Sequence, residues 1–343
     1  MKEMTLRAQS GTTRILLDAK LEDLSKHVPP KTQAVMVVDA EVLRLHGPRL
    51  PKLPVISIEA TEDNKSLDTI CKIYEFFMQQ ELDRTGFVIG IGGGIVCDMA
   101  GFAASTYMRG VPFAYAPTTL LAQADASLGG KTGVNLQGYK NQVGTFCQPS
   151  FVLMDLSVLK TLPGPQVRDG FAEIIKHAAI ADAQLFEMLE KNAKDALVLD
   201  EKALRAILLR SLAVKISVVE KDEKEAGVRR LLNFGHTLGH AIEKTQQKSH
   251  GQAVAIGMVL AAKMSVERKM MKEGECKRLI SLLRAYGLPT ELDGRPDALL
   301  QAVTHDKKRA GASLHMVLLE KIGQAKVVAV QMDKLAGDLH DLR

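Results

Sequence analysis

The 343-residue sequence predicts an α/β domain with a mainly parallel sheet, followed by a domain built almost entirely of helices. Up to about residue 155, short β-type runs alternate with stretches of helical spacing, which is typical of a parallel sheet covered on both faces. Beyond the breaker cluster Leu162-Pro163-Gly164-Pro165, nearly all apolar spacing is helical. We therefore predict a first domain at 1–160 and a second at 161–343.

In the first domain, continuous β-branched or apolar runs predict buried strands, and apolar residues at i, i+3 and i+4 predict helices. In chain order these are the strands Ala34–Val38 and Val55–Ile58, the helix Leu67–Gln80, the strand Gly86–Ile91, the helix Asp98–Met108 and the strand Pro112–Ala116.

The second domain shows the helical spacing six times, and a pair of β-type runs around Gly323 indicates a late hairpin. The predicted helices are Glu173–Ile180, Ala183–Lys194, Leu204–Val219, Leu232–Lys244, Ala253–Lys269 and Cys276–Tyr286, and the hairpin strands are Leu314–Leu319 and Ala325–Val330.

Composition excludes several classes of protein. The net charge of +5, from 45 Lys and Arg against 40 Asp and Glu, is too small to indicate a nucleic-acid or membrane partner. The longest apolar run, Phe87–Cys97, is too short for a membrane span. The four cysteines form no CxxC pair, so we expect reduced thiols and a cytoplasmic protein.

A glycine run follows the third predicted strand. Gly92-Gly93-Gly94 leads into a helix, and backbone N–H groups at such a turn suit a pyrophosphate. The dinucleotide fingerprint is not met, because its third glycine falls on Ile95 or Cys97. Nucleotide binding and simple close packing both remain open. Asp39, which ends the first predicted strand, is either a ribose ligand or an ordinary turn residue.

A second motif is a cluster of histidines. His236 and His240 are four residues apart on one helix face, a metal-ligand spacing, and His250 follows soon after. Such a pair is also common on helix surfaces, although flanking glycines would allow another helix to approach closely. Glu173 and Lys176 share a helix face, either as a solvated pair or as a metal ligand beside an ammonium. A carboxylate with two histidines would make a catalytic zinc-type site.

A third motif is the lysine-containing loop that begins at Asp125. Its Gly-Gly-Lys-Thr segment fails the P-loop frame, so hydrolysis of a nucleoside triphosphate is not expected. Lys131, Lys140 and Asn141 suit recognition of a phosphate or carboxylate, and each is alternatively a solvated loop residue.

Taken together, these segments resemble the 3-dehydroquinate synthase family from about Val37 to Val327. The resemblance is carried, in order, by GGGIVCDMAGFAASTYMRGVPF, PTTLLAQADASLGGKTGVN with YKNQVGTF, GFAEIIKHAAI, LLNFGHTLGHAIE, SHGQAVAIGM and HDKK. It implies an N-terminal Rossmann-like NAD-binding domain, a C-terminal all-α metal-binding domain and a homodimer. The sequence departs from the family pattern at Glu41, where Asn is usual, and at Asp169, where a small residue or Asn is usual.

The resemblance also implies roles for individual residues. Zinc or cobalt would be held by Glu173, His236 and His250. The NAD-binding positions correspond to Asp39, Glu62, Lys65, Gly93, Gly94, Asp98, Thr118, Thr119, Lys140, Thr161 and Leu162. The substrate-binding positions correspond to Arg109 of the neighbouring subunit, Asp125, Lys131, Asn141, Lys176, Lys215, Arg229, Asn233, His240 and Lys307. Among these and the metal ligands, the expected catalytic residues are Lys176, Glu173, His240, Lys215, Asp125 and Asn141.

The implied reaction converts 3-deoxy-D-arabino-heptulosonate 7-phosphate into 3-dehydroquinate and phosphate, a carbon–oxygen lyase step of the shikimate pathway in aromatic amino acid biosynthesis. NAD would be reduced and reoxidised within each turnover. The alternatives are another sugar phosphate cyclase, a metal-dependent glycerol or alcohol dehydrogenase, and a non-catalytic NAD-binding regulator. A regulator would be expected to lose some of Glu173, Lys176, His236 and His250, and all four are present.

Overall fold

A computed structural model of the chain describes residues 1–293 and 313–331, together with residue 335. By their internal contacts these residues form two compact units. The first unit comprises Met1–Val167 and Lys215–Lys224, and the second comprises Arg168–Val214 and the described residues from Glu225 onward. The domain limits 1–160 and 161–343 stay predictions.

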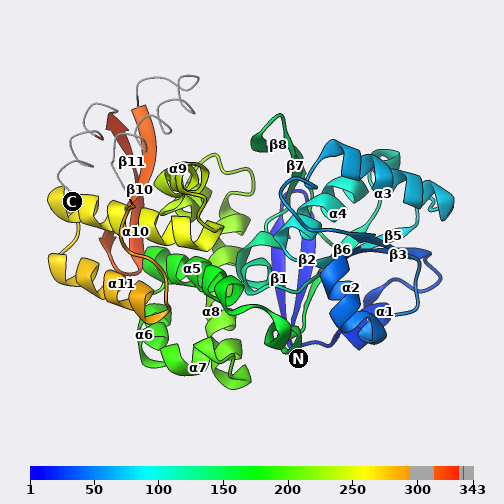
Figure 1. Cartoon of the computed structure of the whole chain (residues 1–343), viewed down its shortest axis with the longest axis horizontal. Helices are drawn as coiled ribbons and strands as arrows, with labels where there is room; N and C mark the ends of the chain where they lie inside the picture. The colour runs from blue at the N-terminus through cyan, green and yellow to red at the C-terminus, as the bar shows by residue number, and fades with distance from the viewer. Residues whose placement is uncertain (294–312, 332–334, 336–343) are drawn as a thin grey trace. The chain divides into compact units, whose positions relative to one another are not determined.

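The first unit is built on a seven-stranded sheet with the order β1-β2-β9-β6-β5-β3-β4, of which Figure 1 labels β1, β2, β6, β5 and β3. Its strands are β1 (Lys2–Ala8), β2 (Gly11–Leu17), β3 (Ala34–Asp39), β4 (Val55–Ile58), β5 (Phe87–Gly92), β6 (Phe113–Pro117) and β9 (Phe151–Met154). Only β1 and β2 pair antiparallel, and all other neighbours are parallel. The predicted mainly parallel α/β sheet is therefore confirmed, as are its four predicted strands.

Helices cover both faces of this sheet, as a parallel sheet requires. The helical segments are η1 (Leu21–Asp23), α1 (Leu24–His27), α2 (Ala40–His46), η2 (Gly47–Arg49), α3 (Leu67–Gln79), α4 (Gly94–Thr106), η3 (Tyr107–Arg109), η4 (Ala122–Ala126) and η5 (Leu156–Thr161). One core joins alternate strand residues such as Val38 and Ile91 to Leu24 and Val42. On the opposite face, α4 packs against β5.

The helix after the glycine run begins earlier than predicted. We expected its start at Asp98, but α4 begins at Gly94, with Gly93 as its N-cap. The early start is compatible with the sequence of the turn, because glycine is among the residues that N-caps accept. Gly90 lets α4 lie close to the sheet, since a Cβ atom there would be 2.8 Å from the Cβ of Ala100.

The hairpin of β7 (Lys131–Leu136) and β8 (Tyr139–Phe146) was not predicted. Its turn residues Gln137 and Gly138 both have positive φ, which is typical of a tight two-residue hairpin. Most of β8 is exposed, so the segment lacks the apolar run by which four strands of the large sheet were predicted. The strands β1, β2 and β9 were not predicted either.

The second unit is mainly helical, as predicted. Its elements are α5 (Gly164–Ala181, from Arg168), α6 (Ala183–Lys191), α7 (Ala193–Leu197), α8 (Glu201–Lys221, as far as Val214), η6 (Val228–Asn233), α9 (His236–Gln246), α10 (His250–Glu267), α11 (Glu273–Ala285), β10 (Ser313–Lys321) and β11 (Gln324–Gln331). The antiparallel β10–β11 hairpin confirms the expectation around Gly323, so the description all-α is wrong for this hairpin.

Several predicted helix limits in this unit differ from the observed ones, and the starts of α5 and α9 differ most. α5 begins at Gly164 instead of Glu173, because Pro165 lies in its first turn, where a missing N–H costs little. The predicted helix Leu232–Lys244 is broken at Gly235, which has a φ of +79°. A Cβ atom at Gly235 would lie 2.6 Å from the carbonyl oxygen of Val254, so the break also brings α9 close to α10. Among the described residues, no helix is sufficiently long and apolar to cross a membrane.

Candidate functional site

Three potential metal ligands converge in the second unit. Glu173 comes from α5, while His236 and His250 are the first residues of α9 and α10. The Oε1 atom of Glu173 lies 3.4 Å from Nε2 of His236 and 3.2 Å from Nε2 of His250. The three ligand atoms lie within 4.8 Å of one another. One carboxylate oxygen and two imidazole nitrogens suit a catalytic Zn²⁺ or a similar divalent ion, with a further position left for substrate.

The other nitrogen of each histidine faces an oxygen. Nδ1 of His236 lies 3.2 Å from the carbonyl oxygen of Phe234, and Nδ1 of His250 lies 3.8 Å from Oε2 of Glu243. An oxygen at Nδ1 favours the tautomer that leaves Nε2 available to a metal. Glu243 was not predicted, because no spacing rule in the sequence connects it to His250.

His240 lies beside this cluster but outside the ligand set. Its ring centroid is 5.5 Å from that of His236 and 6.5 Å from that of His250, and the residue is exposed. The i, i+4 spacing therefore places His236 and His240 near each other, but the three converging ligand atoms include His250 instead.

Electrostatics in this cluster are dominated by a buried carboxylate. Glu173 is fully buried and forms an ion pair with the equally buried Lys176. Burial alone would raise the pKa of Glu173, but Lys176 and His236 hold it well below its ordinary value. Burial also lowers the pKa of His236, which favours the neutral ring that a metal requires. The carboxylate is thus charged and held in place by an ammonium.

In the first unit, five predicted NAD-binding residues gather at the carboxyl ends of β3, β5 and β6. Asp39 ends β3, Gly93 and Gly94 open α4, and Thr118 and Thr119 follow β6. No side chain caps the start of α4, and a Cβ atom at Gly93 would be 3.1 Å from Cγ2 of Thr119. This bare helix N-terminus at the carboxyl edge of a parallel sheet fits a pyrophosphate.

Asp39 and Glu41 point to different partners. The Asp39 carboxylate caps α2 by accepting a hydrogen bond of 3.0 Å from the backbone N–H of Glu41. Burial raises the pKa of Asp39. The side chain of Glu41 is exposed and pairs with Arg44 at 2.6 Å. The side chain of Glu41, which departs from the family pattern, therefore pairs with Arg44, while the backbone N–H of Glu41 still donates to the Asp39 carboxylate.

A second group of predicted residues surrounds the buried ammonium of Lys65. Its Nζ donates to Oδ2 of Asp98 and to Oδ1 of Asn141, both at 2.5 Å. Burial raises the pKa of Asp98, although the positive charge of Lys65 partly offsets this rise. Asn135 completes the group. Its side-chain oxygen accepts a hydrogen bond from the backbone N–H of Asn141, and its side-chain amide donates to the Glu62 carboxylate at 2.9 Å. Its backbone N–H donates to the carbonyl oxygen of Lys65.

Asn135 was not predicted as a site residue, although it stands in the quoted GGKTGVN motif. Glu62 lies 3.8 Å from Lys140, another predicted NAD-binding residue. The structure thus brings Glu62, Lys65, Asp98, Lys140 and Asn141 together through contacts that join the segment before α3 to α4 and the β7–β8 hairpin.

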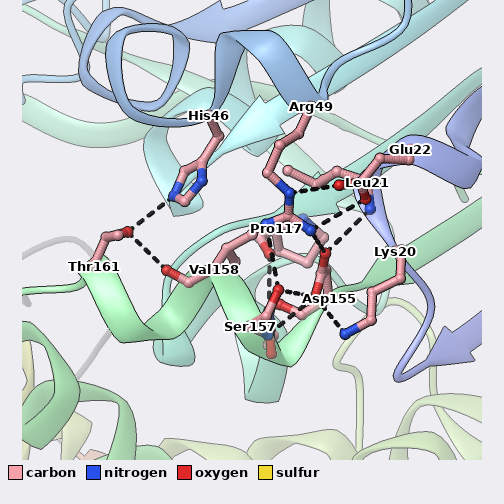
Figure 2. A network of polar contacts seen from close by, with 11 residues as sticks. Lys20, Leu21, Glu22, His46, Arg49, Pro117, Asp155, Ser157, Val158 and Thr161 are labelled. Carbon is pink, nitrogen blue, oxygen red and sulfur yellow. Dashed lines mark hydrogen bonds and ion pairs between the residues drawn. The ribbon is translucent and has the colours of Figure 1, made fainter.

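Thr161 and Leu162 lie at the end of η5, which is held by the network in Figure 2. Oγ1 of Thr161 donates to the carbonyl of Val158 at 2.9 Å and lies 2.9 Å from Nε2 of His46. At the other end of η5, the buried Asp155 caps the helix through Ser157 and accepts a hydrogen bond of 2.6 Å from Arg49. His46 was not predicted, since it is distant in sequence from every motif.

The remaining predicted residues fall in several places. In the first unit, the buried Lys215 donates to Oδ1 of Asp125 at 2.5 Å, Lys131 begins β7, and the exposed Arg109 has a φ of +69°. In the second unit, the buried Arg229 and the half-buried Asn233 lie on η6, and Asn233 donates to Glu225. Lys307 lies outside the described residues.

Family models and curated relatives both identify the 3-dehydroquinate synthase family. A family model described as 3-dehydroquinate synthase N-terminal matches residues 55–169, and one described as 3-dehydroquinate synthase C-terminal matches residues 170–309. A curated 3-dehydroquinate synthase of Enterococcus faecalis (strain ATCC 47077 / OG1RF) is 41% identical over 322 residues, which cover 90% of this chain and 89% of the relative.

Two solved structures are similar along the whole chain. A 2-deoxy-scyllo-inosose synthase complexed with carbaglucose-6-phosphate, NAD⁺ and Co²⁺ has a TM-score of 0.89 at 26% identity, covering 99% of this chain and 100% of the other. A 2-epi-5-epi-valiolone synthase from Streptomyces hygroscopicus subsp. jinggangensis 5008, with NAD⁺ and Zn²⁺ bound, has a TM-score of 0.87 at 29% identity, covering 100% and 98%.

Proposed function

Because the chain belongs to the 3-dehydroquinate synthase family, its reaction is the conversion of 3-deoxy-D-arabino-heptulosonate 7-phosphate into 3-dehydroquinate and phosphate, and we propose residues that perform it. The chain is thus an enzyme of aromatic amino acid biosynthesis, a lyase that uses NAD and a divalent metal.

The observation that carries our assignment is the convergence of Glu173, His236 and His250. We propose that these three residues hold Zn²⁺ or Co²⁺, the ions named for the two similar cyclase structures. When bound, NAD would supply reversible hydride transfer at C5 of the substrate, and a metal held by these three residues would polarise the hydroxyl at that carbon. Lys176 keeps Glu173 ionised and correctly oriented for this role.

For NAD, we propose that the backbone N–H groups at Gly93 and Gly94 bind the pyrophosphate, because the start of α4 has no other cap. Asp39 accepts hydrogen bonds from ribose hydroxyls. The other proposed contacts are Glu62, Lys65, Asp98, Thr118, Thr119, Lys140, Thr161 and Leu162. The ion pair of Lys65 with Asp98 keeps this group rigid, so little ordering is needed when the nucleotide binds.

The substrate carries a carboxylate and a phosphate, and we propose as its ligands the cationic side chains of Lys131, Lys215, Arg229, Lys307 and Arg109. In the absence of an anionic ligand, the Asp125 carboxylate pairs with the buried ammonium of Lys215 and balances its charge. Asn141, Asn233 and His240 supply hydrogen bonds. Lys176, His240 and Lys215 are proposed to move protons during phosphate elimination and ring closure.

We further propose that the enzyme is a cytoplasmic homodimer in which Arg109 reaches the substrate of the neighbouring subunit. The exposed position of Arg109 supports a side chain that is available to a neighbouring subunit. Light scattering should give twice the chain mass. A catalytically dead Lys176→Ala protein mixed with an Arg109→Ala protein should recover part of the activity, because mixed dimers contain one intact site.

The reaction itself is tested by incubating the protein with the heptulosonate phosphate and an amount of NAD far below that of substrate. We expect stoichiometric release of phosphate and no net NADH. Accumulation of NADH without phosphate would instead identify a dehydrogenase. A sugar phosphate without the carboxylate serves as the second substrate, and faster turnover of that compound would identify another sugar phosphate cyclase.

A further inference from the structure

Asp169 lies one helical turn before Glu173 on α5 and faces the beginning of α10. Its Oδ1 atom accepts a hydrogen bond of 2.6 Å from the hydroxyl of Ser249. Ser249 is the N-cap of α10 and immediately precedes His250. A single carboxylate on α5 is therefore connected to the residue next to a proposed metal ligand on another helix.

The same carboxylate reaches further into the first turn of α10. The backbone N–H of Gln252 lowers the pKa of Asp169 and donates to the Ser249 hydroxyl in a capping box, in which the Gln252 side chain accepts from the Ser249 N–H at 3.3 Å. Free N–H groups at a helix start attract a negative charge. Asp169 thus acts as a cap for α10 that is supplied by a neighbouring helix.

Close packing also holds α5 and α10 together at this point. A Cβ atom at Gly251 would lie 2.3 Å from Cα of Asp169 and 2.7 Å from its Oδ1. Only a glycine therefore allows the start of α10 to lie directly on the backbone of α5. His250 is enclosed between two residues, Ser249 and Gly251, that both contact Asp169.

We propose that Asp169 is a positioning residue, which sets His250 at its distance from Glu173 by holding the residues on either side of this histidine. The proposal rests on the metal-ligand role assigned above to Glu173 and His250. Asp169 and Glu173 both belong to α5. Contacts that anchor the start of α10 to Asp169 therefore also fix the position of His250 relative to Glu173. Metal sites depend on such outer contacts for ligand orientation.

The test uses the full-length protein freed of metal and titrated with Co²⁺ in competition with a chelator. We expect Asp169→Ala to weaken Co²⁺ binding by about tenfold, the lower end of what outer contacts contribute. The visible absorption bands of bound Co²⁺, which report ligand geometry, should change as well. Asp169→Asn retains the acceptor oxygen, so it should restore most of the affinity and the bands of the unsubstituted protein.

Asp182 provides a matched control, because it also caps a helix of the second unit, accepting from the backbone N–H of Leu185 at 3.0 Å. Asp182→Ala should lower the melting temperature without altering Co²⁺ affinity or absorption. If Asp169→Ala behaves in the same way, Asp169 is merely structural and the proposal is wrong. If Asp169→Ala does not fold, Ser249→Ala replaces it, and unchanged Co²⁺ binding there would equally overturn the proposal.

A failure of the ligand assignment gives a different result. His250→Ala and Glu173→Ala should lose Co²⁺ binding altogether. Full Co²⁺ binding by these two variants would refute the metal site itself. If they lose Co²⁺ while the Asp169→Ala and Ser249→Ala variants bind it normally, only the positioning role of Asp169 is refuted.

Discussion

The carboxylate of Glu173 lies 3.2 Å from Nε2 of His250, although 77 residues separate the two in the chain. This contact joins α5 to α10 and defines the proposed metal site. Replacing either residue removes one of three ligands, so Glu173→Gln and His250→Ala should reduce bound metal more than about 100-fold and abolish phosphate release. Metal content by atomic emission and turnover should fall together.

His315 is exposed on β10 and serves as the control for this prediction. His315→Ala should keep full metal content and activity. A Glu173→Gln protein that retains one bound metal per chain would contradict the ligand assignment.

The Lys65–Asp98 pair should matter for both stability and NAD binding. Lys65→Met leaves the Asp98 carboxylate without its ammonium in a largely buried place, at a cost of about 2–4 kcal/mol in the free energy of unfolding. NAD affinity should fall at least about tenfold, which is about 1.4 kcal/mol of binding free energy. Urea unfolding and NAD titration measure the two effects.

Adding Asp98→Asn to Lys65→Met should restore much of the stability, because no unpaired charge remains, but should not restore NAD binding. Lys72→Met, at an exposed position of the same helix α3, should change neither quantity. NAD binding of normal strength in the Lys65→Met protein would refute the role of this lysine.

Close packing at Gly90 should be essential for the nucleotide turn. A Cβ atom there would lie 2.8 Å from Ala100 and 3.2 Å from the Tyr115 ring, so Gly90→Ala forces α4 away from β5. We expect a loss of about 1–3 kcal/mol in unfolding free energy, together with weaker NAD binding. Gly274→Ala is the control, because nothing lies within 4 Å of a Cβ atom there in α11. It should be neutral or stabilising by up to about 1 kcal/mol.

Asp155 should contribute to the acid sensitivity of the fold. Burial alone would raise the pKa of Asp155, but hydrogen bonds from Ser157 and Leu21 and the charge of Arg49 bring it below the ordinary value of 3.8 (Figure 2). Near that pH the folded state therefore binds fewer protons than the unfolded state. The stability that ionised Asp155 contributes to the folded state is fully present at pH values well above 3.8. This contribution is lost as the pH falls through the lower pKa of Asp155 in the folded state.

Asp155→Asn should consequently lower the free energy of unfolding by about 2–3 kcal/mol at neutral pH. It should also reduce the further loss of stability between about pH 5 and pH 2, compared with the unsubstituted protein. Urea unfolding at several pH values measures both, with the exposed Asp68→Asn as a control. An unchanged pH profile in Asp155→Asn would contradict the assigned pKa direction.

The elements that could be predicted are those whose residues carry the pattern of burial. β5 is buried along its whole length and appears in the sequence as an apolar run, and α3 buries Ile70, Ile73 and Phe77 at helical spacing. The β7–β8 hairpin could not be predicted, because an exposed strand such as β8 has no apolar period. The break at Gly235 was missed because the apolar spacing continues across it.

In the candidate site, spacing alone indicated His236 with His240, whereas the converging ligand atoms belong to His236, His250 and Glu173. The family resemblance pointed to that set from ordered motifs. Contacts between separate elements were not predictable, even where one partner, such as Glu243, stands in a quoted motif. Glu243 beside His250 and His46 beside Thr161 are brought together by packing between separate elements.

By itself, the sequence determined the alternation of strands and helices, the glycine turn and the family, because local periodicity and ordered motifs are written along the chain. Only the tertiary structure decided how these parts meet. Gly235 and Gly251 let helices approach at backbone distance, and that approach brings Asp169 to Ser249 and Glu173 to His250. Such contacts depend on the packing of distant segments, for which no local pattern exists.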